Sequence, residues 1–343
     1  MPERRSKYRW EVEPLCFSAN GKYLLAEARS LGNQQSMLVI CVETDEVVFE
    51  SPRVHNCTMR MAMTPDASLA AMATPENQTW VYDVPSSMRI CVLPDTNHMA
   101  LSPNNRLICT TDSRGHRLKV WPVEPSAVPI EYNVQTLIMH LCVSSNSSMV
   151  ACGTGANVCI CDTGTAQLIT VVPLPSENPR ILYLDSTTLL TSTYPRDECI
   201  ISTASSWADG ATPNVTHALY NPQAKFLGRS YMQWHPSVAS VYKRMDDGHY
   251  QFVIYGLVSG QVLHALPTMM YNTALVSPTL THYALTVTFG KSDFEEMIIR
   301  PTPLLFGIAT FILASRRKIR GGYLPPLPSE VCYVIWLYFQ LSL

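Results

Sequence analysis

Short apolar stretches separated by polar turns run through most of the chain, and their order repeats. An apolar stretch is followed by Ser or Thr, then by a turn with Asn, Asp, Gly or Pro, and then by a second apolar stretch. The clearest copies are LCFSANGKYLL, MAMTPDASLAAM, MALSPNNRLICT and LCVSSNSSMVAC, around Phe17, Met63, Leu101 and Val143. Short apolar stretches bounded by turn residues are typical of β-strands.

Three weaker copies continue the series around Leu184, Trp234 and Val276. The copies follow one another at a mean interval of about 43 residues, which is the length of one four-stranded sheet in a circular array. Such a sheet cannot bury both of its faces alone, so neighbouring sheets stack round a common axis. The repeat therefore predicts an all-β chain of seven stacked units.

The third strand of several units ends on an aromatic residue or an aspartate. These endings are VYD at Asp83, KVW at Trp121 and ICD at Asp162. Together with the FSANGK, TPD and SPNN turns, they resemble the WD-repeat family over roughly residues 8 to 300, although the family's Gly-His pair is essentially missing. The resemblance implies a seven-bladed β-propeller. Two packed β-sandwiches are the alternative, but they do not explain the recurring order of turns and strand endings.

The propeller is expected to occupy residues 1–300 and to close on itself. The final unit has only three expected strands, at Thr273 to Val276, His282 to Thr288 and Glu295 to Arg300. The segment at about 7–13 precedes the first unit and is expected to supply the fourth strand. Ring closure of this kind is common in the family that the chain resembles.

Residues 301–343 follow a different pattern. After Pro301 and Pro303, apolar residues recur at three- and four-residue steps, which indicates a helix. Gly321-Gly322 is expected to end this helix, and Ser329 is the expected N-cap of a second one after a Pro-rich turn. The pattern predicts a C-terminal helical hairpin.

This tail resembles the SOCS box of ubiquitin-ligase adaptors. The run Thr310–Arg320 is similar to the elongin-binding helix of that family, with Phe311 and Ser315 in place of its usual Leu and Cys. The resemblance implies contacts with elongin B/C and a cullin. The residues that it assigns are Phe311, Ser315 and Ile319 for elongin, and Leu327, Pro328, Val331 and Ile335 for the cullin.

Two other interpretations of the tail stay open. An F-box is the neighbouring resemblance, because Leu327-Pro328-Ser-Glu330-Val is similar to the start of its first helix. An F-box, however, needs a third helix, for which no residues remain. The other interpretation is that the helices pack on the propeller as an internal brace.

Composition excludes several classes of function. Lys and Arg number 25 against 27 Asp and Glu, which argues against binding along a nucleic-acid backbone. No apolar run reaches eighteen residues and no signal peptide is recognised at the N-terminus, so we expect no transmembrane segment and a cytoplasmic location, with the nucleus open. Most of the 11 cysteines are then expected to be small buried hydrophobes.

Catalytic motifs are weak, and we expect no enzyme, cofactor or metal. Asp162-Thr-Gly164 matches the active-site turn of aspartic proteases, but a second copy is missing and the position fits a strand end. Cys159 and Cys161 lie at alternate positions of an expected strand and fall short of a four-ligand zinc set. The histidines form no cluster in the sequence. The leading hypothesis is a protein-binding propeller that acts as a ligase adaptor, and the alternative is a scaffold subunit with a bracing tail.

Overall fold

The computed structural model describes most of the first two hundred residues and separate strands after them. The described residues are 11–30, 34–55, 60–124, 128–134, 136–155, 157–174, 180–192, 199–207, 209, 214–219, 224–225, 238–244, 250–256, 262–266, 271–276, 282–288 and 295–301. The predicted C-terminal helices and all seven predicted partner-binding residues of the tail lie outside these ranges.

All strands of the described residues belong to seven antiparallel sheets. The first sheet contains β1 (Glu11–Phe17), β2 (Tyr23–Arg29), β3 (Gln34–Cys41) and β4 (Glu46–Glu50), with the short β5 (Val54–His55) paired to β3. The second contains β6 (Met61–Met63), β7 (Leu69–Ala73), β8 (Thr79–Asp83) and β9 (Met88–Leu93). The third contains β10 (Met99–Leu101), β11 (Leu107–Thr111), β12 (Arg117–Pro122) and β13 (Ile130–Asn133).

The remaining sheets repeat this order. The fourth contains β14 (Ile138–Val143), β15 (Met149–Thr154), β16 (Asn157–Asp162) and β17 (Leu168–Pro173). The fifth contains β18 (Arg180–Leu184), β19 (Thr188–Ser192), β20 (Cys199–Thr203) and β21 (Asn214–Leu219). The sixth contains β22 (Ala224–Lys225), β23 (Val238–Arg244), β24 (Tyr250–Gly256) and β25 (Val262–Leu266), and the seventh contains β26 (Tyr271–Val276), β27 (His282–Thr288) and β28 (Glu295–Pro301).

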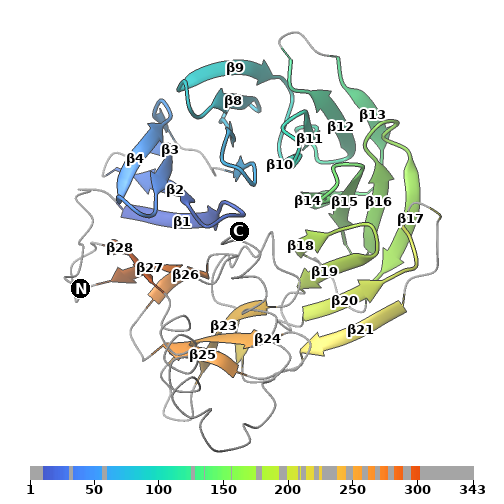
Figure 1. Ribbon diagram of the computed structural model, residues 1–343. Coiled ribbons are helices and arrows are strands. Elements are labelled where there is room, and N and C mark those ends of the chain that lie inside the picture. The colour runs from blue at the N-terminus through green and yellow to red at the C-terminus, as the bar shows by residue number, and fades with distance from the viewer. Residues whose placement is uncertain are drawn as a thin grey trace, which may run out of the picture.

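The sheets follow one another round a common centre (Figure 1). In the third and fourth sheets, β10 and β14 lie toward the centre, and β13 and β17 lie outermost (Figure 1). The two ends of the array meet, because β1 packs against β26, β27 and β28 of the last sheet. The all-β prediction is confirmed for the described residues, and the strand order agrees with the repeat read from the sequence.

The core lies between neighbouring sheets. One cluster joins the first two sheets through residues such as Leu25, Met37 and Met72, and another joins the third and fourth. The middle strands β7 and β15 are therefore covered on both faces and are buried along their whole length. This explains why their sequences are nearly continuous apolar runs instead of alternating ones.

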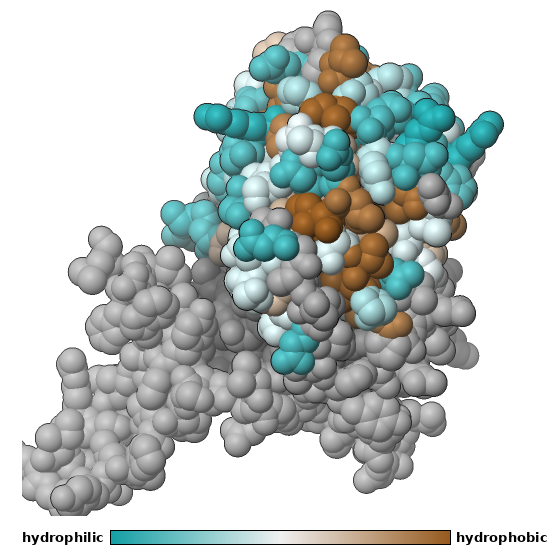
Figure 2. Space-filling view, turned by 90° about the vertical axis from the view of Figure 1, so that its right-hand side faces the viewer, coloured by the Kyte–Doolittle hydropathy of each residue, from teal (hydrophilic) through white to brown (hydrophobic). Residues whose placement is uncertain are grey.

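The outermost strands pack on fewer neighbours. Figure 2 views the molecule from the side of β13 and β17 and shows apolar side chains between polar ones. Ile130 on β13 and Leu168 and Val171 on β17 are each at least 40% exposed. Isolated apolar residues of this kind are common on soluble surfaces.

The predicted closing strand at 7–13 is placed only in part. Its residues 11–13 belong to β1, where Glu11 pairs with Arg29 and Glu13 pairs with Glu27 on β2. They start the first sheet and do not complete the last one, which has three strands among the described residues. Residues 7–10 lie outside the described ranges, so closure by a segment before β1 stays a prediction.

The recurring Ser/Thr turn is built by the same hydrogen bonds in four sheets. In the first, the Tyr23 N–H donates to Ser18 Oγ at 2.9 Å, the Ser18 hydroxyl donates to Asn20 Oδ1 at 2.7 Å, and the Lys22 N–H donates to Asn20 Oδ1 at 3.0 Å. The equivalent pairs are Thr64 with Asp66, Ser102 with Asn104, and Ser144 with Asn146. The side chains thus close each turn locally.

We expect Ser144→Ala to lower the free energy of unfolding by about 1–3 kcal/mol, because the buried Met149 N–H loses its acceptor at 2.9 Å. The neighbouring Ser145 is exposed, and Ser145→Ala is the matched control, with an expected effect within about 0.5 kcal/mol. Urea midpoints at constant slope measure both effects. Equal midpoints for the two variants would contradict a structural role for the turn hydroxyl.

Candidate functional site

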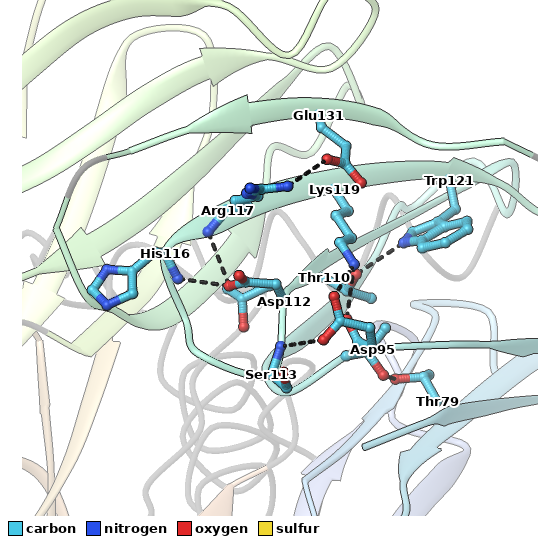
Figure 3. Close-up of polar contacts among 12 residues, drawn as sticks. Thr79, Asp95, Thr110, Asp112, Ser113, His116, Arg117, Lys119, Trp121 and Glu131 are labelled. Atoms are coloured by element: carbon cyan, nitrogen blue, oxygen red, sulfur yellow. Dashed lines mark hydrogen bonds and ion pairs between the residues drawn. The ribbon is translucent and has the colours of Figure 1, made fainter. Parts of the chain in front are cut away.

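The two ends of the ring carry different loops. The Ser/Thr turns lie at one end. The other end, called the loop face here, contains residues 74–78, 94–98, 112–116 and 136–137, which join the second strand to the third or lead into a first strand. Figure 3 shows the part of the loop face around Asp95 and Asp112. Backbone atoms connect its segments, since the Thr96 N–H donates to the Asn77 carbonyl at 2.7 Å.

Asp95 and Lys119 fasten one loop to the third sheet. Lys119 on β12 has only 7% of its side chain exposed, and its Nζ donates to Asp95 Oδ2 at 2.6 Å and to the Asp95 carbonyl at 3.0 Å. The Ser113 N–H donates to the other carboxylate oxygen of Asp95 at 3.0 Å. The hydrogen bond from Lys119 is the main reason why the pKa of Asp95 is lowered to about 2.

The neighbouring loop is held by Asp112, whose buried carboxylate accepts the N–H groups of His116 at 2.7 Å and Arg117 at 3.0 Å (Figure 3). Gly115 has a φ of +76°, and a Cβ there would lie 2.7 Å from Leu137 Cδ1, so the turn requires glycine. This frame leaves Ser113, Arg114 and His116 exposed. The loop face therefore presents polar side chains on a fixed backbone.

An inner basic cluster, defined as Arg60, His98 and His140, lies where the innermost strands begin. Arg60 immediately precedes β6, His98 immediately precedes β10, and His140 is on β14. The Arg60 guanidinium donates to Asn97 Oδ1, and the His98 and His140 rings meet edge to face with centroids 6.2 Å apart. Burial, followed by the charges of Arg60 and His140, lowers the pKa of His98 to about 3.

The contact between His98 and His140 was not predicted from the sequence. A signal was present in the sequence: Arg60, His98 and His140 each lie three positions before Met63, Leu101 and Val143, the reference residues of successive repeats. Equivalent positions of a circular repeat converge near the axis, so residues about 40 positions apart become neighbours.

The low pKa of His98 gives a testable dependence of stability on pH. Below pH 6.5 the unfolded chain binds a proton at this site that the folded chain does not bind until the pH nears 3. Stability is therefore expected to fall as the pH drops through this window, by at most about 1.4 kcal/mol per pH unit from this residue. Urea unfolding of His98→Gln should show a shallower slope between pH 6.5 and 4. The exposed His116→Gln is the control, and an unchanged slope in His98→Gln would contradict the assignment.

Other predicted residues have structural roles. Asp162 Oδ1 accepts the N–H groups of Gly164 and Thr165 at 2.9 and 2.8 Å, as expected of a strand-end turn. Cys159 pairs across the strands with the buried Cys152. The aromatic residues of the second and third sheets belong to the core: Tyr82 and Trp121 are buried, and Trp80 is partly buried. Among the described residues, no group of three or more His, Cys, Asp or Glu is arranged to hold a metal ion.

Comparison with known proteins identifies the fold. No family model matches the chain, and no curated protein matches its sequence. Among solved structures, the β-propeller domain of Cps50 (Swd1) from Myceliophteria thermophila superimposes with a TM-score of 0.64 over 87% of this chain and 99% of that one. The fold is a β-propeller. At 12% sequence identity, this likeness to the Swd1 propeller concerns the fold alone.

In a β-propeller, the loop face is one end of a ring of stacked sheets. Loops at the end of a ring of stacked sheets are held by a rigid scaffold, which is where binding residues commonly lie.

Among the described residues, no helix is long and apolar enough to cross a membrane.

Proposed function

We propose that the chain is a non-enzymatic, seven-bladed propeller that binds other proteins through the loop face and works in the cytoplasm or the nucleus. The seven sheets among the described strands support the blade number. The observation that carries the function is the loop at 112–116, which is fixed by Asp95, Asp112 and Lys119 while Arg114 and His116 stay exposed. A loop that is already ordered loses little entropy when it binds.

The test compares charge reversal at the two ends of the ring. Arg114→Glu changes an exposed residue of the loop face, and Arg106→Glu makes the same change in an exposed Ser/Thr turn. The wild type and each full-length variant are expressed in separate cell cultures, and the proteins that co-purify with each are quantified. We expect Arg114→Glu to lose partners that Arg106→Glu retains. If both variants recovered the same partners, the loop face would be excluded as the protein-binding surface.

We further propose that residues 301–343 form a separate tail that links the propeller to a ubiquitin ligase. The resemblance of Thr310–Arg320 to an elongin-binding helix supports this proposal. In it, Phe311, Ser315 and Ile319 fill a groove of elongin B/C, and the segment from Leu327 to Ile335 contacts a cullin. A propeller that captures a protein would then present it for ubiquitination.

A pull-down with purified elongin B/C tests the tail directly. The wild-type chain is expected to recover elongin, and Phe311→Ala combined with Ser315→Asp is expected to abolish recovery. The control Arg114→Glu leaves the tail sequence intact and should recover elongin normally. Recovery that does not differ between the wild type and the double variant would reject the ligase link and favour the alternative, a scaffold subunit whose tail braces the propeller.

A further inference from the structure

A pocket of about 710 Å³ opens between the first two sheets, away from the loop at 112–116. It is lined by the end of β4 and the residues that follow it, and by residues of β8 and β9. Phe49 and Tyr82 meet there, with ring centroids 5.1 Å apart. Pockets of this size accept small molecules or a few residues of a peptide.

Two arginines, Arg53 and Arg89, line this pocket from different sheets. Arg89 on β9 lies with its Cζ 5.1 Å from the centre of the Trp80 ring, which holds the cation in place. Arg53 follows β4 and lies 3.9 Å from Glu50, the acidic residue of the lining. The three charges sum to +1, so the pocket favours an anion.

Tyr82 also belongs to the lining of this pocket and carries a hydrogen-bond donor. Its side chain is 2% exposed, and its hydroxyl has no hydrogen-bond partner among the described residues. A buried donor without a partner is destabilising unless a ligand satisfies it. Burial raises the pKa of Tyr82 to about 12, so the hydroxyl keeps its proton at neutral pH and can donate it.

We propose that this pocket binds a phosphorylated Ser or Thr side chain of a partner protein, with Arg53 and Arg89 on the phosphate oxygens and Tyr82 donating its hydroxyl to one of them. A phosphate group carries close to two negative charges and three acceptor oxygens. Two guanidinium groups and one hydroxyl can therefore satisfy a phosphate more fully than a carboxylate, which has one charge and two oxygens. The inference deepens the proposed protein-binding function and rests on it for the source of the phosphate.

The decisive variant is Tyr82→Phe, because it separates binding from folding. It removes only the unpartnered hydroxyl, so the folded state is expected to be as stable as the wild type or more stable, while affinity for the phosphate falls about tenfold. If the Tyr82 hydroxyl had only a structural role, Tyr82→Phe would be less stable than the wild type and would bind the phosphate equally well. Arg89→Gln is expected to weaken binding by tenfold or more, and Arg106→Gln, an exposed arginine of the third sheet, is the control.

Isothermal titration of the full chain uses three peptides, acetyl-Gly-Gly-X-Gly-Gly-amide with X as phosphoserine, Ser or Glu, at matched ionic strength. We expect binding of the phosphoserine peptide, competition by inorganic phosphate, and much weaker binding of the others. Equal affinity for the Glu peptide overturns the assignment to phosphate, and equal binding by wild type, Tyr82→Phe and Arg89→Gln overturns the site. These titrations need no cellular partner, so their failure is distinguishable from failure of the loop-face experiment.

Discussion

Replacing Trp207 with alanine is expected to lower the free energy of unfolding by about 3–5 kcal/mol. Trp207 is fully buried in the cluster that joins the fourth and fifth sheets, where it packs with Ile160, Leu184 and Leu189. Its backbone N–H donates to the Ser186 carbonyl at 3.0 Å, so the residue lies beside the turn between β18 and β19. Removal of the indole leaves a cavity between two blades that neither rigid sheet can fill.

Trp207→Phe is the matched comparison for this effect. Phenylalanine keeps most of the ring volume and removes the indole N–H, which has no hydrogen-bond partner among the described residues. We expect it to cost less than about 1.5 kcal/mol. Chemical denaturation monitored by circular dichroism measures both variants. Equal losses for Ala and Phe would contradict packing by ring volume as the reason that Trp207 stabilises the propeller.

The second large effect is expected at Asp95. Asp95→Ala leaves the Lys119 ammonium, which is 7% exposed, without its carboxylate partner at 2.6 Å. Breaking a buried ion pair from one side costs about 3–5 kcal/mol. Because Asp95 itself is 52% exposed, we expect Asp95→Ala to lower the free energy of unfolding by about 2–3 kcal/mol. Part of this loss comes from the Ser113 N–H, which no longer has its acceptor.

Lys119→Met provides the contrast, because it removes the buried charge and keeps a side chain of similar length. We expect it to change stability by less than about 1 kcal/mol, and we expect Lys119→Met to restore most of the stability that Asp95→Ala loses. The wild type should also lose the contribution of Asp95 as the pH falls from about 4 to 2, since the folded pKa lies below the unfolded value. Equal effects of the two single variants would contradict this account.

The sequence predicted best what is decided locally. Ser18, Asn20 and Tyr23 are within five positions of one another, and their side chains close the turn without help from distant residues. The same pattern in three further copies was therefore enough to find the strand pairs, their order and the all-β class.

What the sequence did not reveal depends on contacts between repeats. Asp95 and Lys119 are 24 positions apart and meet only because a loop of one sheet crosses to the next. The pocket at Arg53 and Arg89 is lined by residues of two different sheets, and no sequence motif marks it. The residues of the inner basic cluster occupy equivalent positions of the repeat. These positions predict a contact only once the repeats are known to form a ring.

The central claim is a closed ring, and the distance between its ends tests it. Nitroxide side chains placed at Lys22 in the first sheet and Arg300 on β28 report this distance by pulsed electron paramagnetic resonance. Because β1 packs against β26–β28, neighbouring sheets should place the labels within roughly 30 Å. An open stack of seven sheets at about 10 Å spacing puts them about 60 Å apart, and a distance near that value would contradict the account.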